Sequence, residues 1–160
     1  MYEFGSTTAL SGDELFRELH SGARALVEGE PDAVANMANI AALIAQLMPD
    51  LNWAGFYRVI SSELVLGPFI GKPACIRIAL GQGVCGTAAA MGTTQRIDDV
   101  HAFPGHIACD AASASELVVP VKRDGAAIAV IDLDSPQRAR FSDADARAFE
   151  TLADIVAAAI

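Results

Sequence analysis

The chain contains three cysteines, and one of them lies where a cysteine is unexpected. Residues 101–113 read HAFPGHIACDAAS, a stretch with no helical or strand period that includes Cys109. A cysteine without a disulfide is usually buried as a small hydrophobe, and one that stays reactive usually does so because the protein uses it. Cys75 and Cys85 bring the total to an odd number, which argues against permanent disulfides. The three thiols are therefore candidates for core residues, metal ligands or transient redox partners.

Two further pairs of residues have a spacing that allows chemistry. Asp132 and Asp134 alternate along a predicted strand, so both side chains should point to the same face of a sheet. Taken alone, such a pair is more often found at a solvated strand end. Trp53 and Tyr57 are four positions apart on another predicted strand and also share a face, where ordinary core packing is the alternative interpretation.

The histidines and glycines do not form a recognisable site motif. His101, His106, Cys85 and Cys109 can be drawn as a zinc site or a proton relay, but no CxxC or HExxH spacing supports a metal. We therefore expect no metal, and we expect the histidines to shape their loop. The segment GQGVCG lacks the GK[ST] ending of a phosphate-binding loop.

The elements that must position these residues follow from the hydrophobic pattern. A capping box at Ser11 and Glu14 predicts a helix to about residue 28, and a second helical period ends at Pro49. The period then changes to two, which is typical of strands. We expect strands over 51–60, 63–70, 74–80, 94–97, 116–123 and 126–135, a short helix over 84–91, and a final helix capped by Ser142 and Asp145.

Hairpins rather than crossover helices link most of these strands, so the sheet should be mainly antiparallel. We expect an α+β fold in a single domain over residues 1–160. The N- and C-terminal helices should pack on one face of the sheet. The long loop over 98–113 and the short helix should cover the other face and enclose a ligand pocket, since loops of this length are usually functional or disordered.

Composition excludes several classes of function. The net charge is −9 over 160 residues, which argues against binding nucleic acid or an anionic membrane. No apolar stretch approaches the ~20 residues of a membrane span, and the first residues, MYEFGSTTAL, lack a signal peptide pattern. We therefore expect a cytoplasmic protein. A sheet edge and apolar terminal helices would allow a homodimer.

Several segments resemble one known family. The stretches NWAGFY, LVLGPFIGKPACIRI, GQGVCGTAA, DVHAFPGHIACDAAS and SELVVPV are similar to those of the free methionine-(R)-sulfoxide reductases, which have a GAF fold. The similarity runs from about residue 10 to the last residue. The segment over 99–116 distinguishes this family from other GAF domains, and all three of the family's cysteine positions are occupied.

The resemblance implies a redox chemistry for the three thiols. Cys109 would be the nucleophile that reduces free methionine sulfoxide and becomes a sulfenic acid. Cys75 would resolve it through an intramolecular disulfide, with Cys85 as the second candidate for that role. Thioredoxin or a similar dithiol protein would open the disulfide, and no cofactor would be needed.

The resemblance also implies which residues line the substrate site. Glu116 and Asp134 would stabilise the polarised sulfoxide and deliver its proton, and Asp132 would pair with the substrate ammonium group. Trp53 would form the wall for the substrate methyl group, and Tyr57 would offer its hydroxyl as a further polar contact.

Two other classes of function remain open from the sequence. GAF domains often bind small molecules as sensors, without catalysis, and fold alone does not fix function. A redox sensor that only traps oxidant is a third, weaker alternative.

Overall fold

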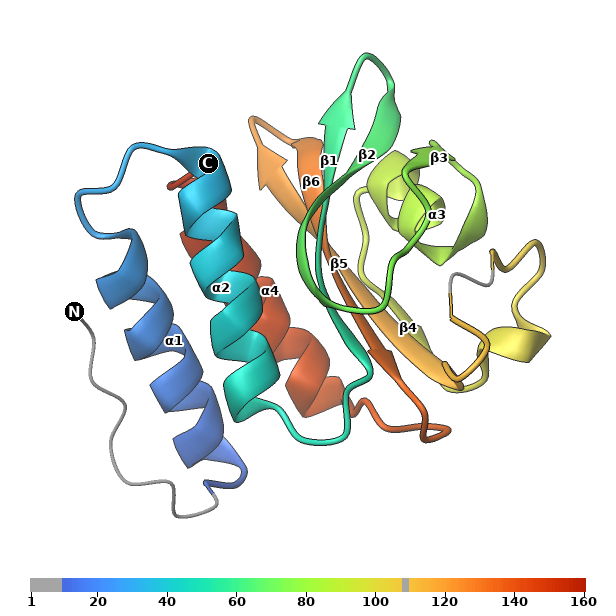
Figure 1. Ribbon diagram of the computed structural model, residues 1–160, viewed down its shortest axis with the longest axis horizontal. Helices are drawn as coiled ribbons and strands as arrows, with labels where there is room; N and C mark the ends of the chain where they lie inside the picture. Colours follow the sequence, from blue (N-terminus) through green and yellow to red (C-terminus); the bar gives the residue numbers. More distant parts are fainter. Residues whose placement is uncertain (1–9, 108–109) are drawn as a thin grey trace.

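The computed structural model describes residues 10–107 and 110–160 of the chain (Figure 1). The four α-helices are α1 (Asp13–Val27), α2 (Ala33–Leu47), α3 (Gly83–Met91) and α4 (Asp143–Ala157). The strands are β1 (Trp53–Ile60), β2 (Glu63–Gly71), β3 (Arg77–Ala79), β4 (Gln95–Ile97), β5 (Ser115–Arg123) and β6 (Ala126–Ser135). A 3-10 helix, η1 (Val100–Ala102), interrupts the long loop.

The strands form one six-stranded sheet in the order β3-β2-β1-β6-β5-β4, and every neighbouring pair is antiparallel. β5 and β6 are joined by a tight hairpin at Asp124 and Gly125, which both have positive φ. β1 and β6 lie at the centre, because β6 pairs with β1 on one side and β5 on the other. The expectation of a mainly antiparallel sheet is confirmed.

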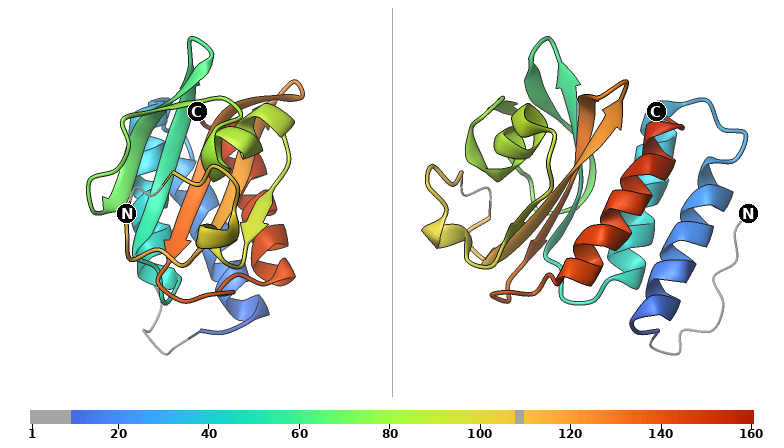
Figure 2. Two further views of the ribbon diagram at one scale, coloured as in Figure 1. Left: turned by 90° about the vertical axis from the view of Figure 1, so that its right-hand side faces the viewer. Right: turned by 180° about the vertical axis from the view of Figure 1, so that it is seen from behind.

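The helices and the sheet form layers, which are visible edge-on in Figure 1 and from behind in Figure 2. α2 and α4 pack on one face of the sheet, and α1 packs outside them against both. α3 and the loops around η1 lie on the opposite face. The expected α+β arrangement, with the terminal helices on one face and α3 with the long loop on the other, is thus confirmed. Among the described residues, no helix has the length and apolar character needed to cross a bilayer.

The face under the helices is the main hydrophobic core. Every second residue of the central strands points into it, including Phe56, Leu117, Val119, Ile131 and Leu133, and each is almost fully buried. These side chains pack on the apolar stripes of α2 and α4. Burial of this kind stabilises a fold by about 1.5–3 kcal/mol for each large side chain.

The two predicted helix caps had different outcomes. Ser142 and Asp145 form a complete capping box at the start of α4, as predicted. The box predicted at Ser11 and Glu14 was wrong, because Gly12 takes the N-cap position of α1 with a positive φ of 55°. That shift moves Ser11 outside the cap, and no side chain in the described part of the chain caps the first turn of α1.

The predicted strand around Cys75 is shorter than expected. β3 begins at Arg77, and Cys75 lies in the loop that joins β2 to β3. Pro73 in this loop has no backbone N–H to donate to a neighbouring strand, so regular pairing starts only after it. The prediction that Cys75 lies on a strand was therefore wrong.

Candidate functional site

Three carboxylates project from the face of the sheet opposite the main core. Glu116 comes from β5, and Asp132 and Asp134 come from β6. Glu116 and Asp134 are direct cross-strand partners, and Asp134 is also the partner of Trp53 on β1. One row across three strands therefore carries Trp53, Asp134 and Glu116, and Asp132 lies two residues along β6 on the same face.

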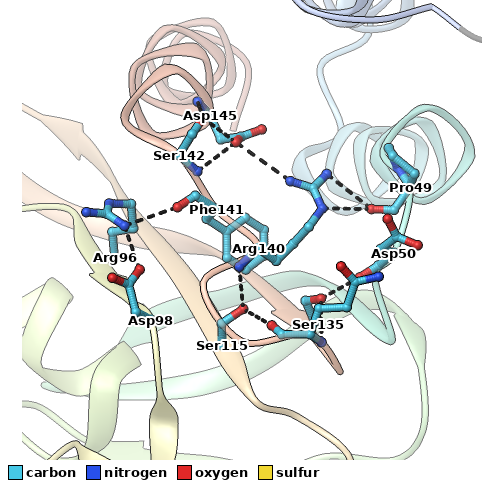
Figure 3. A network of polar contacts seen from close by, with 11 residues as sticks. Pro49, Asp50, Arg96, Asp98, Ser115, Ser135, Arg140, Phe141, Ser142 and Asp145 are labelled. Atoms are coloured by element: carbon cyan, nitrogen blue, oxygen red, sulfur yellow. Dashed lines mark hydrogen bonds and ion pairs between the residues drawn. The ribbon is translucent and has the colours of Figure 1, made fainter.

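The adjacent residues anchor the same strand ends from the helix side. Ser115 precedes Glu116, and its hydroxyl donates to the carbonyl of Gln137 at 2.6 Å and accepts from the amide of Arg140 (Figure 3). Ser135 follows Asp134, and its hydroxyl donates to the carbonyl of Asp50 at 2.7 Å. These bonds fix the backbone of the two strands where they present their carboxylates.

The guanidinium of Arg140 extends this network. It donates through Nε and Nη2 to the carbonyl of Pro49 at 3.2 and 3.1 Å, and it lies 3.7 Å from the carboxylate of Asp145 (Figure 3). The segment after β6, the start of α4 and the α2–β1 connection are thereby tied together behind the carboxylates.

Helix α3 covers the carboxylates and adds a thiol to them. The Sγ of Cys85, in the first turn of α3, lies 3.9 Å from Oε1 of Glu116. Gly86 of the same turn lies close to β3, where an added Cβ would be 2.4 Å from the carbonyl oxygen of Ala79. A glycine at this position therefore allows α3 to approach closely enough to bring Cys85 to the acidic group.

The space between α3, the sheet and the loop is a cavity of about 400 Å³. The residues that line it include Tyr57, Cys85, His106, Asp110, Ser113, Glu116, Asp132 and Asp134. A second cavity, of about 230 Å³, lies beside it and is lined by Trp53, Lys72 and Pro73 among others. Tyr57, Asp110, Asp132 and Asp134 line both, so the two cavities share an acidic boundary.

Burial keeps these acids from ionising at their usual pH. It raises the pKa of Glu116 well above its ordinary value, and the nearby charges of Asp132 and Asp134 raise it further. Burial likewise raises the pKa of Asp132 to about 6. Burial and the nearby charge of Asp132 raise the pKa of Asp134 well above its ordinary value. Burial and the same acids raise the pKa of the Cys85 thiol, which is 4% exposed. Burial of the site therefore favours the protonated forms of its acids, which is the form that a general acid needs.

Both predicted aromatic residues lie against the cavities and also hold the β2–β3 loop. The indole nitrogen of Trp53 donates to the carbonyl of Lys72 at 3.1 Å, and its ring stacks on Phe69 at 5.2 Å. The hydroxyl of Tyr57 donates to the carbonyl of Cys75 at 3.0 Å. The half-buried Cys75 is thus fixed through its backbone at the edge of the same site.

A set of polar residues that the sequence analysis missed ties the long loop to the strand ends. Asn52 donates to the Asp110 carboxylate at 3.2 Å and to the Ser113 hydroxyl at 3.0 Å. The Lys72 ammonium lies 3.2 Å from the other Asp110 oxygen, which also accepts from the amide of Ala112 at 2.9 Å. The Ala112 amide, followed by Lys72 and Asn52, lowers the pKa of Asp110. Their positions offered a signal for this role. Asn52 directly precedes β1 and Lys72 directly follows β2, and polar residues at such strand ends can bind a neighbouring loop.

Cys109, the predicted nucleophile, lies outside the described residues, as does Ala108. Asp110, the first described residue after Cys109, lines both cavities. His106 lines the larger cavity, and burial together with the charge of His101 lowers its pKa. The rings of His101 and His106 meet edge to face at 6.3 Å.

The predicted site residues in the described chain therefore converge. Glu116, Asp132, Asp134 and Cys85 surround one cavity, with Trp53, Tyr57 and the Cys75 loop beside them. The sequence model of the GAF domain matches residues 13–160. The chain belongs to the GAF domain family.

Within the GAF family, this chain is similar over most of its length to several known proteins. It is 49% identical to the free methionine-R-sulfoxide reductase of Escherichia coli over 139 residues, which cover 87% of this chain and 84% of that protein. The free methionine-R-sulfoxide reductase of Neisseria meningitidis, solved in complex with its substrate, is 43% identical with a TM-score of 0.89, covering 96% and 93% of the two chains. A putative GAF sensor protein of Burkholderia vietnamiensis is 56% identical with a TM-score of 0.90, covering 94% and 96%. This chain is thus a GAF protein closely related to free methionine-R-sulfoxide reductases.

Proposed function

We propose that this protein reduces free L-methionine (R)-sulfoxide to methionine with a cysteine nucleophile. The observation that supports this most is the convergence of three carboxyl groups, from β5 and β6, on a cavity beside the loop that carries Cys109. The preference for the free amino acid and for the R form follows the names of the E. coli and N. meningitidis relatives.

In the proposed reaction, the Cys109 thiolate attacks the sulfoxide sulfur while a carboxyl group protonates the departing oxygen. The S–O bond of the substrate breaks, the oxygen ends on Cys109 as a sulfenic acid, and methionine leaves reduced by two electrons. Glu116 and Asp134 fit the role of acid, because burial and the nearby carboxylates raise the pKa of both groups and so favour their protonated forms.

A second thiol then closes the cycle. The Cys75 thiol attacks the Cys109 sulfenic acid, water leaves, and an intramolecular disulfide forms. Cys75 fits this role better than Cys85, because Cys75 is half-buried in a loop at the edge of the site whereas Cys85 is buried in the first turn of α3. Thioredoxin or a similar dithiol protein would reduce the disulfide, which must be reached from outside. We further propose that the chain works as a single GAF domain in the cytoplasm, where such dithiols are kept reduced.

The cavities offer complementary charges for a free amino acid. Asp132 would take the substrate ammonium group, and Trp53 would contact the methyl group on sulfur. Among the described residues that line the two cavities, Lys72 is the one Lys or Arg. Its ammonium group would therefore take the substrate carboxylate, which a peptide bond would remove.

A coupled assay tests the proposal. Consumption of NADPH through thioredoxin reductase and thioredoxin should follow addition of free methionine (R)-sulfoxide, with little response to the S form or to the N-acetyl amide. Cys109→Ser should abolish turnover. One equivalent of sulfoxide should also remove two thiols from the reduced protein, whereas a sensor that only binds the ligand would lose none. Unchanged thiol content after addition of substrate would refute the proposal.

A further inference from the structure

The thiol of Cys85 and two of the carboxylates form a compact set of ligand atoms. One ligand atom each from Cys85, Glu116 and Asp132 lies within 4.8 Å of the other two, and all three residues are buried. They come from α3, β5 and β6, so no spaced motif marks the set in the sequence.

An unsatisfied oxygen points to a further ligand at this set. Oδ1 of Asp132 is buried, and no hydrogen-bond partner for it lies among residues 10–107 and 110–160. Buried polar atoms are nearly always partnered, because leaving one unpaired costs about 1–3 kcal/mol. Asp132 also lines both cavities, so a small ion has a route to it.

The donor set is suited to a particular class of ion. Zinc-class cations accept one soft sulfur and hard carboxylate oxygens together, whereas magnesium and calcium prefer oxygens alone. Zinc–sulfur and zinc–oxygen bonds of about 2.3 and 2.1 Å place two tetrahedral ligands about 3.6 Å apart. The 3.9 Å between Sγ of Cys85 and Oε1 of Glu116 is close to that separation.

We propose that a thiophilic divalent cation of the zinc class binds to Cys85, Glu116 and Asp132 in the reduced protein and excludes the substrate. This inference rests on the proposed function, because it assigns Glu116 and Asp132 to the substrate site. The fourth coordination position would face the cavity and take a water molecule. No electrons move: the Sγ–H bond of Cys85 breaks, a sulfur–metal bond forms, and the proton passes to solvent.

The decisive test uses a protein in which Cys85 is the sole thiol. The variant Cys75→Ser with Cys109→Ser, kept reduced with a phosphine, is titrated with Cd²⁺ while the sulfur-to-metal charge-transfer band is recorded. We expect a saturable band at one equivalent of metal. The further change Cys85→Ser should abolish it, and circular dichroism confirms that each variant is folded.

The carboxylates are tested in the same background. Glu116→Gln and Asp132→Asn are close in shape to the native residues, and each should weaken Cd²⁺ binding at least tenfold. Asp154→Asn, on the exposed face of α4, is the matched control and should leave binding unchanged. Equal affinity in all three variants would show that the thiol binds metal without the carboxylates and would overturn the inference.

A functional measurement separates this inference from the proposed function. Zn²⁺ should inhibit sulfoxide reduction in competition with substrate, and EDTA should reverse the inhibition. The Cd²⁺ titration needs no turnover, so an inactive protein that still binds metal would refute the proposed function alone. An active protein without the charge-transfer band would refute the metal site alone.

Discussion

The same strands form both faces of the sheet, but the two faces carry side chains of different kinds. On β5, Leu117 points into the core under α2 and α4, whereas the preceding Glu116 points into the cavity under α3. On β6, Leu133 lies between Asp132 and Asp134 in the same alternation. The face under α2 and α4 is apolar and closely packed. The face under α3 carries the acids and borders two cavities, with the Cys85 thiol beside them.

This difference implies a division between stability and chemistry. Burying apolar groups stabilises the fold, whereas burying carboxyl groups close together destabilises it and raises their pKa. The apolar groups buried under α2 and α4, together with the smaller apolar cluster on the site face, therefore offset the destabilising effect of the buried acids. Substitutions on the two faces should separate loss of activity from loss of stability.

The largest effect is expected at Glu116. Glu116→Gln removes a proton donor but keeps the shape of the side chain, so sulfoxide turnover should fall about 10²- to 10⁴-fold. The free energy of unfolding should not decrease, because a buried acid has been replaced by a neutral amide. Steady-state kinetics and urea denaturation measure the two quantities. A loss of stability that matches the loss of activity would contradict the division.

The adjacent substitution on the same strand should behave in the opposite way. Leu117 is fully buried in the helix-side core, so Leu117→Ala should lower the free energy of unfolding by about 2–5 kcal/mol. The folded fraction should retain a kcat within severalfold of that of the unchanged protein. A collapse of kcat in a folded Leu117→Ala protein would show that the two faces are not independent.

Asp132 should show a stability effect that depends on pH. Its pKa is raised by burial from 3.8 to about 6, so the folded state binds its proton more tightly than the unfolded state. The resulting cost to stability is absent below about pH 3.5, grows between about pH 4 and pH 6, and reaches about 3 kcal/mol above that range. Asp132→Asn should therefore raise the free energy of unfolding at pH 8 and have little effect at pH 3.5. Urea denaturation at the two pH values, with Asp154→Asn as control, measures this, and an equal gain at both would rule it out.

Lys72 should influence binding of the substrate more than chemistry. Its side chain is 68% exposed and pairs with Asp110, so each interaction is worth about 1 kcal/mol or less. Lys72→Met should raise KM for the free amino acid up to about tenfold, with a smaller change in kcat. The control is Lys122→Met, at the far end of β5. An equal rise in KM in both variants would count against a contact with the substrate carboxylate.

The smallest effect is expected at the helix cap on the apolar side. Ser142→Ala removes the hydroxyl of the capping box at α4 and should lower the free energy of unfolding by about 1 kcal/mol. Turnover should not change, because the cap lies behind the sheet. Thermal denaturation and the NADPH-coupled assay provide the comparison, and a specific loss of turnover would reveal coupling through Ser115 and Arg140.

Much of the fold was predictable because its signals are local. The alternation along β5 and β6 set which residues face each side, so Asp132 and Asp134 were correctly predicted to share a face. The capping box at Ser142 was predictable for the same reason, since it depends on four consecutive residues. The Ser11 box failed because Gly12 could take the N-cap position with a positive φ, which the pattern does not reveal.

The arrangement of the site was less predictable because it depends on long-range pairing. That Cys85 would lie beside Glu116 requires α3 to pack across β5, which no local pattern encodes. Asn52 and Lys72 were missed because their partner, Asp110, is more than thirty positions away. The roles assigned to Cys75 and Cys109 came from the family resemblance and stay predictions.

The transverse row of Trp53, Asp134 and Glu116 has a consequence for folding. Side chains alternate between the two faces of a strand, so a slip of β6 by one residue would turn its acids into the apolar layer and expose Leu133 instead. A protein with β6 in the wrong register would thus lack both the acidic site and the apolar packing under α2 and α4. Sulfoxide turnover by this protein would therefore show that β6 is paired with β1 and β5 in the correct register.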